Sequence, residues 1–294
     1  MIQYNPKAWV SLIFHSYSRS VMRTLLPSLL FVAIWTALVT LLLDHIFHFD
    51  IKLNTTVHGL LGIVLGLFLV FRTNTAYDRW WEGRKMWGAM VNNCRNLAIK
   101  LSAFLPPSAT EDRAFFARMI SNYPMAMKDH LRQGTRLTEL ELSDDDWELK
   151  MDEKEHPPNY IAGLIYQRIQ GLFAQGAIQG DQLLMLDKEA KALTDIIGAC
   201  ERIRHTPIPY SYSMYMKKFI FLYILTLPVG FAPVFHWWTI PIVLLIFYIL
   251  VSTELIAEEI EDPFGTDAND LDTDGLSLKI KGNVHEILTK NLPQ

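Results

Sequence analysis

An acidic stretch that runs from Glu258 to Gly275 holds the densest group of side chains capable of binding a metal. Within it, Asp270, Asp272 and Asp274 alternate ahead of a glycine, which matches the opening of a calcium-binding EF-hand loop. The closing position of such a loop requires a bidentate glutamate, but this chain has Lys281 there. The sequence therefore argues against an EF-hand.

Two other metal sites are conceivable on the same grounds. Asp267 and Asp270 could form a looser calcium site of oxygen ligands, although a solvated acidic surface that concentrates cations is the alternative. His45 and His48 lie three residues apart, and ordinary interfacial histidines are the alternative there. Motifs of phosphate-binding loops, nucleophile elbows and zinc proteases are lacking. We therefore predict a protein that is not an enzyme, with calcium as the one cofactor left open.

The composition limits the scaffold that carries these groups. The chain has 294 residues, of which 50% are hydrophobic and 20% charged, and its mean hydropathy is +0.15. These values exclude a disordered or fibrous chain. The formal net charge of -4 argues against a nucleic-acid partner. Cys94 and Cys200 have no partner motif, so we expect free thiols.

The apolar residues gather in four runs, each of which predicts a membrane helix. These runs cover about residues 25–47, 56–75, 217–235 and 237–254. Trp237 and Trp238 would anchor the last pair of helices, a tight hairpin, at the membrane interface. Most Lys and Arg residues lie in residues 72–218, so the positive-inside rule places this region and both termini in the cytoplasm.

The rest of the chain is polar and amphipathic. Residues 76–216 repeat apolar side chains every three or four positions, which is the helical period, and strand-like alternation is scarce. With the C-terminal tail, residues 255–294, this region should form a helical cytosolic part. The sequence thus predicts an all-α membrane protein in which residues 1–294 make a single unit.

The second run has a feature typical of a pore. On a helix, Ile63, Leu67 and Phe71 share one bulky apolar stripe. Small residues in the same run would let neighbouring helices approach closely. They are Gly59, Gly62 and Gly66. If several copies surrounded an axis, the stripe would form an apolar constriction that gates by dewetting, whereas ordinary packing of a buried span is the alternative.

Charged residues follow the stripe on successive turns of the same helix. They are Asp78, Arg79, Glu82 and Arg84. We predict that they pair with each other and with neighbours, and that they brace subunits rather than touch ions.

At this point the chain resembles a known family. The segment Gly66 to Gly88 (GLFLVFRTNTAYDRWWEGRKMWG) is similar to the second-span signature of the bestrophins, in particular their bacterial homologues. The segments 200–209 (CERIRHTPIP) and 258–271 (EEIEDPFGTDANDL), with the third and fourth spans, agree in order and distance. This similarity covers nearly the whole chain. It implies a homopentameric ion channel in the bacterial inner membrane, with one central pore and four membrane helices per subunit.

The resemblance also implies which residues line the pore. The family lines its neck with three apolar rings, and the matching positions are Ile63, Leu67 and Phe71. It has a further apolar ring at the cytosolic exit, which unbroken spacing back from Cys200 places at Asp181. A shifted register would place it at Ile178 or Gln182 instead. A ring of carboxylates at the exit would favour cations.

Selectivity and gating are less closely implied. Animal bestrophins bind calcium with an acidic cluster in which this chain keeps only Asp267 and Asp270, so calcium gating is not expected. Animal members pass chloride, whereas bacterial homologues are cation-permeable, so we expect small monovalent ions with a leaning toward cations. The rival classes are a membrane enzyme, which needs a perturbed acid–base pair, and a non-conducting scaffold that docks a cytosolic partner.

Overall fold

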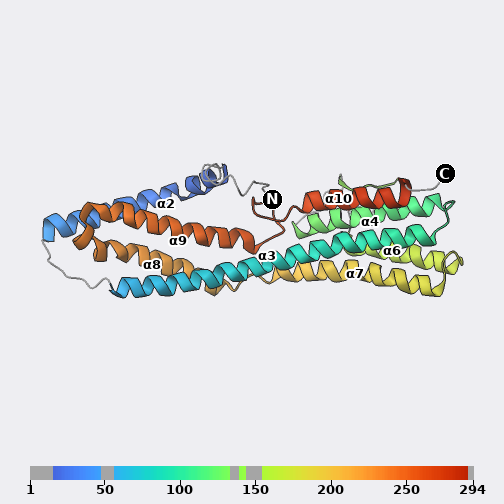
Figure 1. Cartoon of the computed structure of the whole chain (residues 1–294), viewed down its shortest axis with the longest axis horizontal. Coiled ribbons are helices and arrows are strands. Elements are labelled where there is room, and N and C mark those ends of the chain that lie inside the picture. The colour runs from blue at the N-terminus through green and yellow to red at the C-terminus, as the bar shows by residue number, and fades with distance from the viewer. Residues whose placement is uncertain (1–15, 48–55, 133–138, 144–153, 291–294) are drawn as a thin grey trace. The chain divides into compact units, whose positions relative to one another are not determined.

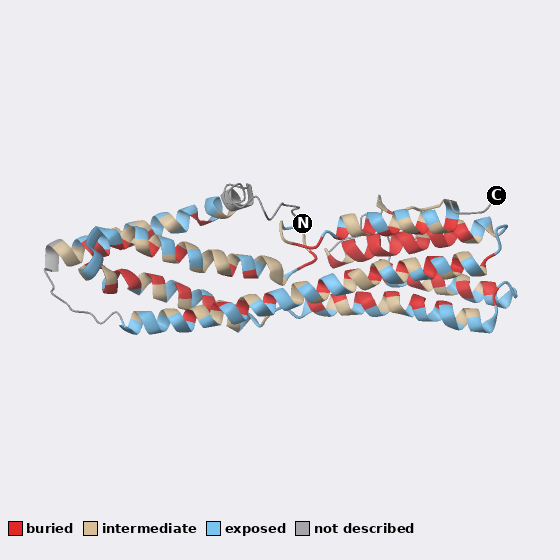
Figure 2. Cartoon of the chain, in the orientation of Figure 1, coloured by how far each residue is buried: buried red, intermediate tan, exposed pale blue. Residues whose placement is uncertain are grey.

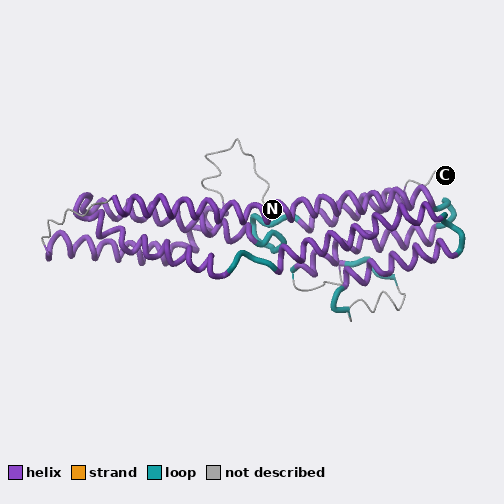
Figure 3. Tube along the Cα trace, turned by 90° about the horizontal axis from the view of Figure 1, so that it is seen from below, coloured by secondary structure: helices purple, strands orange, loops and turns teal. Residues whose placement is uncertain are grey.

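A computed structural model of the chain describes residues 16–47, 56–132, 139–143 and 154–290. These residues form helices joined by turns, and no β-strand occurs among them (Figures 1 and 3). The predicted all-α fold is confirmed. The chain divides into two compact units. Unit 1 comprises Met1–Arg79, Pro207–Glu261 and Asp267–Asn269, and unit 2 comprises Trp80–Thr206, Asp262–Thr266 and Asp270–Gln294.

Unit 1 contains the apolar helices. They are α2 (Ser16–Leu41) with the π-helical turn η1 (Leu42–Phe47), the first part of α3 (Thr56–Phe104), α8 (Tyr210–Phe235) and α9 (Thr239–Glu261). Helices α2, α8 and α9 pack against one another in pairs. The turn His236–Trp238 joins α8 to α9, which run antiparallel (Figure 1), and His236 has a positive φ of 50° at this reversal.

Three helical stretches are long and apolar enough to cross a membrane: Val21–Asp44, Thr56–Phe104 and Tyr210–Glu261. The reversal at His236 divides the third stretch into α8 and α9. The four expected membrane helices therefore correspond to α2, the first part of α3, α8 and α9. Helix α3 does not end near residue 75, because no proline interrupts it before Phe104.

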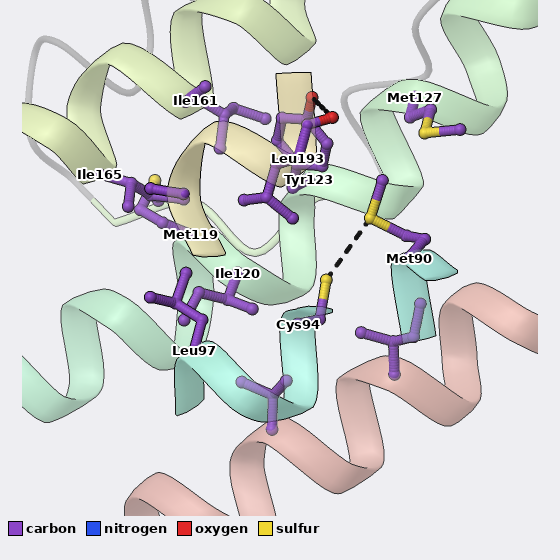
Figure 4. Close-up of a cluster of buried hydrophobic side chains, with 14 of the residues drawn as sticks. Met90, Cys94, Leu97, Met119, Ile120, Tyr123, Met127, Ile161, Ile165 and Leu193 are labelled. Carbon is purple, nitrogen blue, oxygen red and sulfur yellow. Dashed lines mark hydrogen bonds between the residues drawn. The ribbon is translucent and has the colours of Figure 1, made fainter. Parts of the chain in front are cut away.

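Unit 2 is a bundle of amphipathic helices. It contains the second part of α3, α4 (Thr110–Leu131), α6 (Pro157–Ala174), α7 (Gly180–His205) and α10 (Thr273–His285) with the turn η5 (Glu286–Lys290). Helix α4 contacts α6, α7 and α10, and most of its residues are buried (Figure 2). Figure 4 shows part of the core, where the Tyr123 hydroxyl donates to the Leu193 carbonyl oxygen at 2.8 Å.

Candidate functional site

One face of the first part of α3 presents bulky apolar side chains that the described chain leaves uncovered. Ile63 is 72% exposed, and Leu67 and Phe71 are each 56% exposed. Since they lie four residues apart, they form one stripe along the helix, as the sequence indicated. Such a surface needs either lipid or further copies of the chain to cover it.

The opposite face of the same helix is already occupied. Leu65 and Leu69 are buried in a core that includes Met216 and Ile220 of α8 and Val243 of α9. Because this face packs α3 against the rest of unit 1, the stripe is the face that the described chain leaves open.

The three glycines of the predicted packing face have different surroundings. A Cβ atom at Gly62 would lie 2.7 Å from the Tyr223 hydroxyl oxygen, so this glycine permits close approach of α8. In the described chain, a Cβ at Gly59 or Gly66 would meet nothing within 4 Å. Contact between subunits at these two positions stays a prediction.

A buried ion pair fixes α3 directly beside the stripe. Arg72 is 1% exposed, and its Nη2 donates to Glu261 Oε2 at 2.7 Å, while its Nε lies 3.6 Å from Glu254 Oε1. Glu261 Oε1 also accepts from the Ile208 backbone N–H at 2.7 Å. Buried charges persist only when they are paired, so this cluster ties α3 to α9 next to Phe71.

Sequence reasoning missed this cluster, although a signal was present. Arg72 and Glu254 lie at the ends of apolar runs, and an ionisable residue in a membrane-spanning stretch usually faces a partner in the protein interior. The partner itself could not be read from the sequence.

The four charged residues after the stripe have separate surroundings. Arg79 Nε donates to the Glu261 carbonyl oxygen at 3.0 Å, and Glu82 Oε1 pairs with Arg202 Nη2 at 2.6 Å. Within the described residues, the exposed Asp78 and Arg84 have no ion-pair partner. Bracing between subunits therefore stays a prediction for all four.

The start of α7 carries the candidate exit residues. Ile178 is 3% exposed and belongs to the core of unit 2. The Gln182 side chain is engaged at the helix start, where its Oε1 accepts from the Gln179 backbone N–H at 2.8 Å. Asp181 is exposed, so it is the one of the three predicted residues with an open side chain.

Leu184 is a further candidate at the same place. It is 72% exposed and lies three residues after Asp181, so both side chains share one side of α7. Sequence reasoning did not single it out. The signal was an apolar side chain on the otherwise polar face of an amphipathic helix.

Two segments of the family-like pattern meet inside unit 2. A Cβ atom at Gly83 of α3 would lie 3.1 Å from ring carbons of Phe264 and 3.1 Å from Pro263 Cγ. Phe264 is 1% exposed. Position 83 therefore favours glycine, because the Pro263–Phe264 segment packs closely on the helix backbone there.

The predicted calcium ligands lie just beyond. Asp270 is 2% exposed, and its Oδ2 lies 2.6 Å from where a Cβ at Gly265 would be. Asp267 is exposed. A calcium site that uses Asp267 and Asp270 stays a prediction.

The other EF-hand-like carboxylates have structural roles. Asp272 caps α10, because its Oδ1 accepts from the Gly275 N–H at 3.0 Å. Asp274 pairs with Lys128 Nζ at 2.8 Å and with Arg132 Nη1 at 2.9 Å, and so fastens α10 to the end of α4. Burial opposes ionisation here, but the hydrogen bonds from Lys128 and Arg132 outweigh it and lower the pKa of Asp274.

Cys94 and Cys200 are free, as predicted, and both are buried. The Cys94 thiol donates to Met90 Sδ at 3.6 Å (Figure 4). Burial raises the pKa of the Cys200 thiol to about 12, so this residue is inert at neutral pH. The side chain of His45 and the whole of His48 lie outside the described residues.

Comparison with known proteins identifies relatives along almost the whole chain. The family model described as Bacterial/Fungal Bestrophin protein matches residues 1–286. A voltage-dependent anion channel-forming protein of Synechocystis sp. is 34% identical over 294 residues, which cover 97% of this chain and 93% of that protein. One of the same description from Nostoc sp. is 35% identical over 287 residues, which cover 96% of this chain and 92% of that protein. The crystal structure of a mutant bacterial bestrophin homolog from Klebsiella pneumoniae has a TM-score of 0.84 and 26% identity, over 90% of this chain and 99% of that one.

Proposed function

This chain belongs to the bacterial and fungal bestrophin family, and on that basis we propose that it forms a homopentameric channel for small monovalent ions in the bacterial inner membrane. The family and the names of the relatives point to a channel and not to an enzyme. Lipid would surround the outer helices, and both termini would lie in the cytoplasm, in keeping with the distribution of Lys and Arg.

The observation that carries this proposal is the uncovered apolar stripe on α3. In a ring of subunits, Ile63, Leu67 and Phe71 would line the neck as three apolar rings. Water leaves a narrow apolar constriction readily, so such a neck can gate ion flow. Beyond Phe71, the same side of the helix becomes polar, at the exposed Asn74 and Asp78. The scaffold alternative gives no reason for this change from apolar to polar residues.

Selectivity is the finer part of the proposal. The exposed carboxylate of Asp181 supports a preference for cations, because a ring of such groups at the exit attracts positive ions. The names of the relatives support anions as the second candidate. An exit that is formed by Leu184 would be apolar, and would add a second hydrophobic constriction with no preference for either sign.

The deciding experiment is the reversal potential of the purified protein in a planar bilayer under a potassium chloride gradient. A shift toward the potassium potential that Asp181→Asn diminishes would support the cation channel and place Asp181 on the axis. A shift toward the chloride potential would overturn the cation preference and leave the channel itself intact. Absence of current from a verified pentamer would contradict the channel proposal unless the neck variants described next conduct.

The neck is tested by Leu67→Ala combined with Phe71→Ala. Removal of bulky apolar groups should widen and wet the constriction, so single-channel conductance should rise. Ile34→Ala is the matched control, since Ile34 is an apolar residue of α2 that is 70% exposed and lies outside the proposed pore. Equal conductance in all three proteins would remove these residues from the gate.

A further inference from the structure

Three potential metal ligands from three separate helical regions converge within unit 2. His130 lies in the last turn of α4, His156 directly precedes α6, and Glu201 lies on α7. The Nε2 atoms of both histidines lie 2.8 Å from the same atom, Glu201 Oε1. The two imidazole rings are tilted by 34°, with their centroids 4.3 Å apart. All three ligand atoms lie within 4.8 Å of one another, so small side-chain movements would place them around one ion.

We propose that His130, His156 and Glu201 bind a divalent transition-metal ion of the zinc type. Two imidazole nitrogens and one carboxylate oxygen are a donor set that proteins use for Zn²⁺, with the fourth position left to water. The side chains are 22%, 28% and 27% exposed respectively, so an ion can enter from solvent while the protein restrains the ligands. This site does not depend on the channel proposal.

The charge of the site suits a cation. Burial opposes ionisation of Glu201, but hydrogen bonds from His130 and His156 outweigh it and hold the pKa of this carboxyl below its ordinary value. The backbone at His130 is also held, because Arg204 Nη1 donates to the His130 carbonyl oxygen at 2.9 Å. The site therefore contains an ionised carboxylate, Glu201, and a histidine, His130, whose backbone is held in place.

Metal binding would be coupled to the start of α6. Pro157 and Pro158 have no N–H, so Asn159 supplies the first backbone N–H of the helix, and it donates to His156 Nδ1 at 3.2 Å. In the neutral ring, this acceptor role places the proton on Nε2, where it is donated to Glu201. A metal on Nε2 moves that proton to Nδ1 and removes the cap. When the ion binds, the protein therefore gains coordination bonds but loses the hydrogen bond from the Asn159 N–H to His156. Loss of this bond would loosen the start of α6.

The test is a calorimetric titration of Zn²⁺ into the full-length, chelator-treated protein in detergent. We expect one tight site per chain, and at least about tenfold weaker binding in each of Glu201→Gln, His130→Gln and His156→Asn. Asparagine is a good N-cap residue, so His156→Asn removes the metal ligand and keeps the cap. Without metal, its melting temperature should therefore fall only by the loss of the hydrogen bond to Glu201. The shift in melting temperature that Zn²⁺ causes in the wild type should disappear.

His285→Asn provides the matched control. His285 Nε2 also lies 2.8 Å from a carboxylate oxygen, Glu141 Oε2, but the other oxygen of Glu141 pairs with Lys281 Nζ at 2.7 Å. A histidine–glutamate pair that already holds a cation should not bind zinc tightly, so this variant should titrate as the wild type does. The proposal is overturned if the wild type lacks a tight site, or if the three ligand variants bind Zn²⁺ as tightly as His285→Asn.

Discussion

Among the described residues, most of the large apolar side chains that are exposed lie in unit 1, and only a few, such as Leu184, lie in unit 2. In unit 2, Trp87, Phe116 and Tyr123 are 0% exposed, as in a water-soluble helical bundle. In unit 1, Ile34 is 70% exposed and Ile63 is 72% exposed. Exclusion of water therefore stabilises unit 2, whereas unit 1 is surrounded by a medium as apolar as its own surface. Close packing of small residues and polar contacts must hold the helices of unit 1 together.

The largest expected loss of stability comes from replacing a buried tryptophan of unit 2. Trp87→Ala should destabilise unit 2 by about 3–5 kcal/mol, because it removes a fully buried ring and leaves a cavity. Trp81, six residues earlier on α3, is 48% exposed, so Trp81→Ala should have a much smaller effect. Urea unfolding in detergent measures both. Equal losses would mean that Trp81 is also covered in the assembled protein.

The ion pair in unit 1 should be next in size. Arg72→Met leaves the buried Glu254 and the partly buried Glu261 without their cation, and we expect a loss of about 3 kcal/mol. That value is at the lower end for a broken buried pair, because Glu261 keeps the hydrogen bond from the Ile208 N–H. Thermal unfolding of the detergent-solubilised protein measures the loss. Arg84→Met, at an exposed position of the same helix, is the control, and a similar loss there would contradict the buried-pair interpretation.

Three glycines of α3 allow packing in the two units to be compared directly. Gly83→Ala should cost about 1–3 kcal/mol, because the new methyl group meets the buried Phe264 ring. Gly62→Ala should cost less, because the methyl group meets only the tip of the Tyr223 side chain. Gly59→Ala, with open space in the single chain, should not destabilise it. Thermal melts rank the three, and size-exclusion chromatography shows whether Gly59→Ala disrupts contacts between subunits.

The smallest effect should be a pH dependence in unit 2. Because pairing lowers the pKa of Asp274 in the folded state, the pair stabilises the fold above about pH 3.9, the ordinary pKa of an aspartate, and this contribution is lost as pH falls through the folded-state value. The melting temperature of Asp274→Asn should therefore lie slightly below that of the wild type at pH 6 and approach it as the pH falls below the ordinary pKa of an aspartate. A difference that stays constant with pH would show that charge plays no part. The effect is small because the Asp274 side chain is 53% exposed.

The helical class, the candidate membrane helices and the stripe of Ile63, Leu67 and Phe71 could all be predicted from the sequence alone. Helical period and the length of an apolar run are local properties, so neighbouring residues reveal them. The family resemblance, combined with unbroken spacing back from Cys200, placed the exit prediction at Asp181, at the start of α7.

The tertiary structure decided which faces are covered and which charges meet. Arg72 forms a hydrogen bond with Glu261, 189 residues away in the chain. Gly83 packs against Phe264. His130 and His156 meet at Glu201. None of these contacts has a local signature, because a helix fixes which residues share a face, while residues far away in the chain determine what that face touches.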